Sequence, residues 1–214
     1  MRILVALDAP IQDYTSIRKQ LPRPDFVIAA DGAVRHLSPL GLKPDQILGD
    51  FDTLTKIPDE YKEVEIIRYS MEKDATNGAL AIDHAIKRSP SSIDFVGITG
   101  GLLDHTIANI KLLINLPPEI NITVYNERET VYRITESLSV ETNPETVVSL
   151  VAVQGDPSVT TSGLKYPIEG ERLRSPTHGI SNQAISKTVS ISVAKGEGVL
   201  FAFFYLNTPK AVFI

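Results

Sequence analysis

The amino-acid sequence predicts an α/β protein with two domains: a mainly parallel α/β domain over residues 1–122 and an antiparallel β-sandwich over residues 123–214. Two observations support this prediction. In the first half, short apolar runs alternate with segments of helical periodicity, which is typical of a parallel sheet covered by helices. In the second half, β-branched and aromatic runs are separated only by Gly, Pro, Asn and Asp, which is typical of antiparallel sheets.

The composition is that of a globular protein. The chain has 214 residues, of which 43% are hydrophobic, enough for a sizeable core. It contains no cysteine, which excludes disulfides and thiolate metal sites. The net charge is −5 and the basic residues are scattered, so we expect no nucleic-acid partner. The apolar run at the N-terminus is too short for a signal peptide, and no window approaches the roughly 18 apolar residues of a membrane span. We therefore expect a cytoplasmic protein with no membrane partner.

In the first half, the apolar runs predict strands at residues 3–7, 26–30, 47–48, 64–69 and 95–99. The segments between them predict helices at residues 14–21, 33–40, 77–88 and 106–116. The third helix has the clearest apolar face, and the fourth ends before Pro117 and Pro118. In parallel sheets of this kind, ligands bind at the carboxyl ends of the strands.

In the second half, strands are predicted at or around residues 124, 130–132, 138–140, 147–153, 159–161, 189–193 and 199–206. Residues 188–194 alternate polar and apolar side chains, as a half-buried strand does. Residues 200–206 are nearly all apolar, so they form either a core strand or part of a subunit interface.

Acidic side chains follow several of the predicted strands or open the next turn, at Asp31, Asp50, Asp52, Asp74 and Asp104. If the strand that contains Ile47 and Leu48 continues, Asp50 and Asp52 share one face at a spacing of about 6–7 Å, and Phe51 points into the core. Each signal also has an ordinary explanation, because Asp31 and Thr76 suit helix N-caps and Gly100-Gly101 suits a turn.

Taken together, the acids predict a metal–nucleotide site. If Asp50, Asp52 and Asp74 converge to about 6 Å, each pair repels by roughly 2–3 kcal/mol at an effective dielectric constant of 20. A divalent cation would neutralise them, and Mg²⁺ favours carboxylates combined with substrate phosphates. Glycines beside helix N-termini offer N–H groups to the same phosphates. The G-x-x-x-x-G-K-[ST] and G-x-G-x-x-G loops are both missing, and no G-x-S-x-G elbow indicates a serine hydrolase.

A family resemblance follows from several short motifs that occur in order along nearly the whole chain. They are Ala30-Asp31-Gly32, Pro44-Asp45 with Gly49-Asp50-Phe51-Asp52, Lys73-Asp74-Ala75-Thr76, Gly100-Gly101 through Asp104-His105-Thr106 to Ala108-Asn109, the run from Val159 to Tyr166, and Gly179-Ile180-Ser181-Asn182. This pattern resembles thiamine pyrophosphokinase. The resemblance implies a Rossmann-like ATP-binding domain, a β-sandwich domain that binds thiamine, and a homodimer. It also implies transfer of pyrophosphate from ATP to the hydroxyl of thiamine, with Mg²⁺, giving thiamine diphosphate and AMP.

The resemblance also assigns roles to residues. Asp50, Asp52 and Asp74 would hold Mg²⁺ and the triphosphate, and Asp31 would lie near the attacking hydroxyl. The other nucleotide-site residues would be Gly32, Lys73, Thr76, Asn77, Asp104, His105 and Asn109. From the β domain, Ser181 and Asn182 would contact the thiamine ring, acting across the dimer. In-line positioning and charge neutralisation are what phosphoryl-type transfer requires.

The sequence departs from the family pattern at three positions. Asn77 stands where aspartate is usual, Leu102 where arginine is usual, and Ala33 where glycine is common. The missing arginine removes a bidentate phosphate clamp, for which Arg35 or Lys111 could substitute. Two alternatives therefore stay open: a non-catalytic protein that binds thiamine or nucleotide on the same fold, and a pyrophosphokinase for another heterocyclic alcohol.

Overall fold

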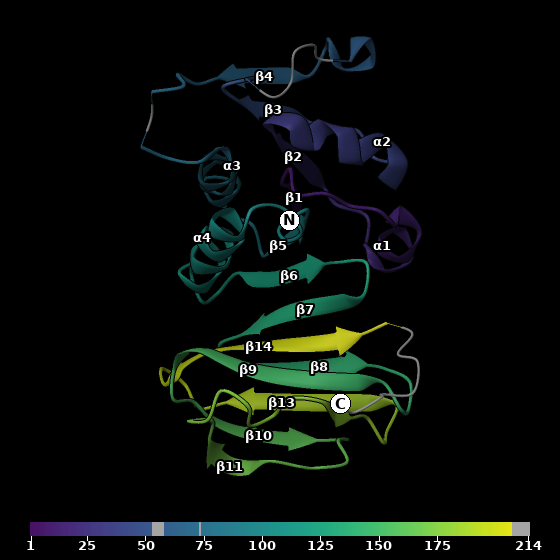
Figure 1. Ribbon diagram of the computed structural model, residues 1–214, viewed down its shortest axis with the longest axis vertical. Coiled ribbons are helices and arrows are strands. Elements are labelled where there is room, and N and C mark those ends of the chain that lie inside the picture. The colour runs from purple at the N-terminus through teal and green to yellow at the C-terminus, as the bar shows by residue number, and fades with distance from the viewer. Residues whose placement is uncertain (53–57, 73, 207–214) are drawn as a thin grey trace. The chain divides into compact units, whose positions relative to one another are not determined.

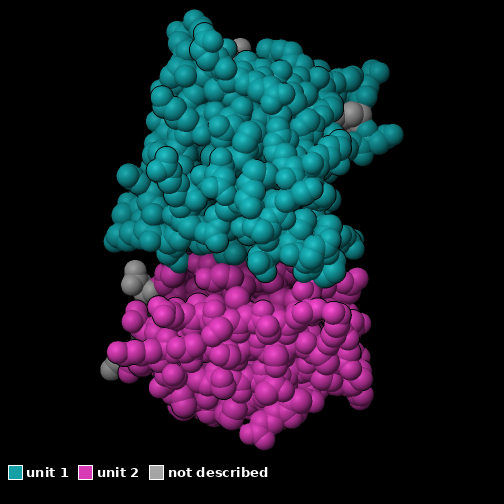
Figure 2. All heavy atoms as spheres, turned by 180° about the vertical axis from the view of Figure 1, so that it is seen from behind, with its two compact units in different colours: residues 1–127 teal, residues 128–214 magenta. Residues whose placement is uncertain are grey.

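The computed structural model describes residues 1–52, 58–72 and 74–206 (Figure 1). The chain divides into two compact units, Met1–Glu127 (unit 1) and Arg128–Ile214 (unit 2), which Figure 2 shows in different colours. The predicted boundary after residue 122 falls inside strand β6 (Asn121–Tyr125) of unit 1. Among the described residues, no helix is long and apolar enough to cross a membrane.

The described strands of unit 1 form a parallel sheet in the order β6-β5-β1-β2-β3-β4. Besides β6, they are β1 (Arg2–Ala6), β2 (Phe26–Ala30), β3 (Gln46–Gly49), β4 (Glu65–Arg68) and β5 (Ser92–Val96). The chain moves outward from β1 to β4 and then returns to place β5 on the other side of β1. The neighbours β1 and β5 thus mark a topological switch point, where sheets of this class bind ligands.

The helices of unit 1 cover both faces of this sheet, with α3 and α4 on one side and α1 and α2 on the other (Figure 1). They are α1 (Tyr14–Gln20), α2 (Leu37–Leu40), α3 (Asn77–Ile86) and α4 (Leu103–Ile114), with 3-10 turns η1 (Asp31–His36) and η2 (Asp59–Tyr61). Thr76 caps α3 by accepting a hydrogen bond from the Ala79 N–H at 3.1 Å. Only half of the helix predicted over residues 33–40 is α-helical: residues 33–36 belong to the 3-10 helix η1, and residues 37–40 form α2.

Unit 2 contains two groups of antiparallel strands, ordered β12-β9-β14-β7 and β11-β10-β13-β8 among the described residues. Their bounds are β7 (Glu129–Ile134), β8 (Ser137–Glu141), β9 (Val147–Gly155), β10 (Ser158–Ser162), β11 (Glu169–Arg172), β12 (Asn182–Gln183), β13 (Thr188–Val193) and β14 (Gly198–Tyr205). Both groups contribute to one core cluster, for example Leu150 and Leu200 from the first and Val159 and Ile191 from the second.

The apolar run at residues 200–206 lies mainly in β14, which pairs with β7 along one edge and β9 along the other. Leu200, Ala202 and Phe204 are buried in the core of unit 2, and the Phe204 ring meets the Tyr132 ring edge-on at 5.6 Å between centroids. The core-strand interpretation of this run is therefore confirmed.

The structure corrects the predicted strands in two places. The strand expected at residues 95–99 is β5 at Ser92–Val96, because the chain turns at Gly97 with φ of 69°. Strands β11 and β12 were not predicted: β11 carries the polar sequence Glu-Gly-Glu-Arg, and β12 has only two residues, so neither shows an apolar alternation. The mixed α/β architecture, with a mainly parallel sheet and an antiparallel sheet, agrees with the prediction.

Candidate active site

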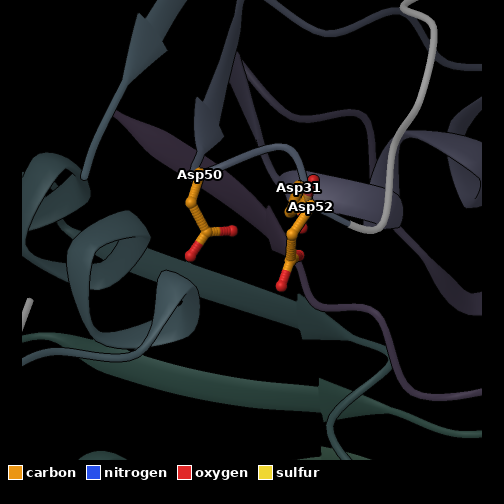
Figure 3. Close-up of side chains that lie close together, drawn as sticks. All are labelled: Asp31, Asp50 and Asp52. Atoms are coloured by element: carbon orange, nitrogen blue, oxygen red, sulfur yellow. The ribbon is translucent and has the colours of Figure 1, made fainter. Parts of the chain in front are cut away.

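Three aspartates converge at the carboxyl ends of β2 and β3 in unit 1 (Figure 3). Asp31 follows β2 directly, and Asp50 and Asp52 follow β3. One oxygen from each carboxylate lies within 4.8 Å of the others. The convergence arises because adjacent parallel strands end at the same edge of the sheet.

The route by which Asp50 and Asp52 reach this group differs from the prediction. Strand β3 ends at Gly49, so Asp50 and Asp52 do not alternate on a strand face, and that premise was wrong. Instead, Phe51 has a left-handed backbone with φ of 59°. Its ring packs against the core of unit 1, as predicted, with the Arg68 guanidinium 4.5 Å from the ring centroid. The turn thus anchors Phe51 while Asp50 and Asp52 approach Asp31.

The backbone around the acids is closely packed and strained. A Cβ at Gly49 would lie 2.9 Å from the Cβ of Asp31, so this close approach requires glycine. Asp31 itself has φ of 51°, a conformation that costs a non-glycine residue on the order of 1 kcal/mol. Strain of this kind is concentrated at functional sites, where the surrounding structure holds it in place.

The electrostatics of the group favour a bound cation. Burial, and then the Asp52 and Asp50 carboxylates, raise the pKa of Asp31 to about 6. Asp31 is only 4% exposed, and its Oδ1 has no hydrogen-bond partner among the described residues. A buried carboxylate oxygen without a donor is costly unless a proton or a metal ion satisfies it. A group of three carboxylates with oxygens within 4.8 Å of one another suits a hard divalent cation such as Mg²⁺.

The acids lie in a pocket of about 750 Å³ within unit 1, at the β1/β5 switch point and the N-termini of α3 and α4. Most predicted site residues of this unit line it: Asp31, Asp50, Asp52, Thr76, Asn77, Asp104, His105 and Asn109. Gly32 and the exposed Asp74 are not among its described lining residues. Lys73, a predicted nucleotide-site residue, lies outside the described residues.

Asparagine side chains shape the walls of this pocket. Asn77 Nδ2 donates to Asp50 Oδ1 at 3.1 Å, so the residue that replaces the family's usual aspartate orients one of the acids. The Asn77 Oδ1 is buried without a hydrogen-bond partner among the described residues. Asn109 Nδ2 donates to the Ile98 carbonyl at 3.2 Å and fixes the turn that follows β5.

A further acid, Asp8, lines the pocket and was not predicted as a site residue. It follows the buried strand β1 at the switch point, and Arg35 Nη2 lies 3.0 Å from its Oδ1. The signal was present in the sequence, because Asp8 ends an apolar run just as Asp31 does. The predicted substitutes for the missing arginine, Arg35 and Lys111, are not among the described lining residues.

In unit 2, the two predicted thiamine-site residues differ sharply. Ser181 is exposed with φ of 57°, and its N–H donates to Ser149 Oγ at 3.0 Å. Asn182 is 5% exposed; its Oδ1 accepts from the N–H groups of Tyr166 at 3.1 Å and Gln183 at 2.8 Å, and its Nδ2 donates to the Tyr166 carbonyl at 2.6 Å. The Asn182 amide is thus engaged in bonds within its own unit.

Comparison with known families matches both units in the expected order. The model described as "Thiamin pyrophosphokinase, catalytic domain" matches residues 17–124, and the model described as "Thiamin pyrophosphokinase, vitamin B1 binding domain" matches residues 135–197. The chain belongs to the thiamin pyrophosphokinase family. The resemblance inferred from the short motifs is therefore confirmed.

Individual relatives agree with this assignment. The chain is 28% identical over 179 residues to a thiamine pyrophosphokinase of Bacillus subtilis, covering 79% of this chain and 83% of the relative. A crystal structure of the Bacillus subtilis enzyme superposes with a TM-score of 0.81 at 24% identity, covering 97% of this chain and 100% of the other. The thiamin pyrophosphokinase of Candida albicans superposes with a TM-score of 0.72 at 15% identity, covering 96% and 90%. At these identities the two structures establish the shared fold.

Proposed function

We propose that this chain is a thiamine diphosphokinase, which transfers the pyrophosphoryl group of ATP to the hydroxyl of thiamine and releases AMP. The observation that carries the proposal is the convergence of Asp31, Asp50 and Asp52 in a pocket of the catalytic unit. Asp50 and Asp52 would hold Mg²⁺, which would offset the charge of the triphosphate, and Asp31 would lie near the attacking hydroxyl. Asp74 lies outside this group of three. In this proposal it is a further ligand of Mg²⁺.

The remaining residues of the pocket bind and orient the substrates in this proposal. The N-termini of α3 and α4 offer N–H groups to phosphate oxygens, and Thr76, Asn77 and His105 lie where these helices begin. The hydroxyl oxygen of thiamine attacks the β-phosphorus of ATP, the bond from this phosphorus to the bridging oxygen of AMP breaks, and Asp31 accepts the hydroxyl proton.

Several finer assignments belong to the same proposal and rest on the family resemblance. They are a Rossmann-like ATP domain, a β-sandwich that binds thiamine through Ser181, nucleotide contacts from Gly32, Lys73, Asp104 and Asn109, a homodimer, and a cytoplasmic enzyme. For Asn182 the hydrogen bonds to Tyr166 support a role in holding the loop beside Ser181.

The test is to incubate the purified chain with Mg-ATP and thiamine and to quantify AMP and thiamine diphosphate, with and without EDTA. We expect both products in equal amounts, and neither when EDTA is present. AMP without thiamine diphosphate would indicate another acceptor alcohol. Thiamine binding without AMP would indicate a non-catalytic protein on this fold.

A further inference from the structure

Asp8, which lines the same pocket as the acidic group, forms an ion pair with Arg35. Arg35 Nη2 lies 3.0 Å from Asp8 Oδ1 and also donates to the Asp8 carbonyl at 2.7 Å. Arg35 belongs to η1, the same turn that carries Asp31, whereas Asp8 follows β1. The pair therefore joins the end of β1 to the turn that presents Asp31.

Asp8 acts on the acidic group at short range. A Cβ at position 32 would lie 2.6 Å from Asp8 Oδ2, so the Asp8 carboxylate packs directly against the backbone next to Asp31. Burial raises the pKa of Asp8, and the Arg35 charge partly offsets this. After burial and the nearer carboxylates, the Asp8 charge adds to the raised pKa of Asp31.

The charge balance of the pocket gives Arg35 its importance. The described lining of the pocket contains no lysine or arginine, but it contains five aspartates: Asp8, Asp31, Asp50, Asp52 and Asp104. A triphosphate entering this pocket meets repulsion from each carboxylate that a cation does not neutralise. Arg35 pairs with Asp8 and is itself not among the described lining residues of the pocket.

We propose that Arg35 is a charge-balancing and positioning residue of the nucleotide site, which cancels Asp8 and so allows the pocket to accept a magnesium-bound triphosphate. The inference rests on the proposed function for the identity of the ligand, Mg-ATP. This chain has Leu102 where the family usually has arginine. The Arg35 guanidinium would then be the group that favours binding of the triphosphate. Arg35 acts here through Asp8 and not as a direct phosphate clamp.

The experiment is a double-mutant cycle read by calorimetric binding of Mg-ATP to the full chain. Arg35→Gln leaves the Asp8 charge uncompensated, so we expect Kd to rise about three- to tenfold at low salt and less at high salt. The double variant Asp8→Asn/Arg35→Gln removes both charges and should return to within about twofold of wild type. Arg35→Lys keeps the charge and should also retain most of the affinity.

The control is Arg18→Gln, which removes an exposed arginine of α1 that is not among the described lining residues and should leave Kd unchanged. Thermal unfolding of each variant measures any loss of packing separately. If the double variant binds Mg-ATP as weakly as Arg35→Gln or more weakly, the pair is only structural and the inference is overturned.

The two proposals fail in different ways. A wild-type chain that binds Mg-ATP but forms no thiamine diphosphate would overturn the proposed function, and the cycle would still decide the role of Arg35. Normal turnover with no rescue in the double variant would overturn the role of Arg35 alone. A wild-type chain that does not bind Mg-ATP would overturn both.

Discussion

In unit 1, Asp31 Oδ1 and Asn77 Oδ1 are buried atoms without hydrogen-bond partners among the described residues, whereas the buried Asn182 side chain of unit 2 makes three hydrogen bonds. An unsatisfied buried polar group costs about 1–3 kcal/mol, so a fold tolerates it where a ligand supplies the partner. Asp31 and Asn77 thus each keep one oxygen without a partner among the described residues, whereas the Asn182 amide is engaged within its own unit.

The strongest test of this contrast is Asp52→Asn in unit 1. The change removes one charge from the acidic group, so the metal-free protein should be at least as stable as wild type. We expect kcat to fall at least a hundredfold, which corresponds to about 3 kcal/mol of transition-state stabilisation. Steady-state kinetics at saturating Mg-ATP and thermal unfolding measure the two effects, with the exposed Asp156→Asn of unit 2 as control. A variant that keeps more than about a third of the wild-type kcat contradicts the metal role.

The matching change in unit 2 is Asn182→Ala, and it should have the opposite signature. It leaves the Tyr166 N–H and carbonyl without their partner, so the free energy of unfolding should fall by about 2–4 kcal/mol. Denaturant unfolding measures this loss. Unchanged stability would show that Asn182 is not engaged in holding its loop, and the contrast between the units would fail.

A buried acid away from the pocket tests whether burial alone explains the raised pKa values of unit 1. Asp94 in β5 is 1% exposed, and burial raises its pKa to about 6, with the Arg2 charge lowering it in part. Because the folded pKa exceeds the unfolded value, the native state binds more protons between about pH 4 and 6, and this group makes stability fall as pH rises through that window.

Asp94→Asn removes that titration. The stability of the variant relative to wild type should therefore improve by about 2 kcal/mol as pH rises from about 4 to 6.5, and then stay constant. Denaturant unfolding at a series of pH values measures the difference. A difference that does not change with pH would mean that Asp94 titrates normally in the native state.

The smallest expected effect concerns the exposed Ser181. In Ser181→Ala the stability should change little, and loss of one hydrogen bond to the thiamine ring should raise the KM for thiamine about 2- to 13-fold. The KM for ATP should stay at the wild-type value, because the acidic pocket belongs to unit 1. An equal rise in both KM values would place Ser181 elsewhere in the catalytic cycle.

The sequence predicted much of the fold because apolar periodicity and turn residues are local signals. It located strands such as β2 and β13 closely, since both are bounded by clear changes in pattern. It could not predict β11 or β12, whose residues are polar or too few. Their pairing depends on neighbours that are distant in sequence, such as β10 and β9.

The candidate site was predicted in part for the same reason. Acids after apolar runs indicated Asp31, Asp50 and Asp52, but the left-handed turn at Phe51 leaves no pattern that sequence reading detects. Asp8 follows an apolar run as Asp31 does, but its ion pair with Arg35, 27 residues away in the chain, leaves no local pattern that sequence reading detects. The hydrogen bonds of Asn182 likewise depend on Tyr166, so its motif could not reveal whether its amide faces a ligand or the backbone.

The placement of β14 has a consequence for synthesis of the chain. β14 is the last described strand in sequence, yet it pairs with both β7 and β9 and completes the core of unit 2. At about 5–20 residues per second, a ribosome finishes the sequence of unit 1 several seconds before it reaches β14. Unit 1 can therefore fold cotranslationally. Until β14 is synthesised, β7 and β9 each have an unpaired edge. During that interval the nascent chain displays unpaired apolar strands, which are binding sites for chaperones and starting points for aggregation.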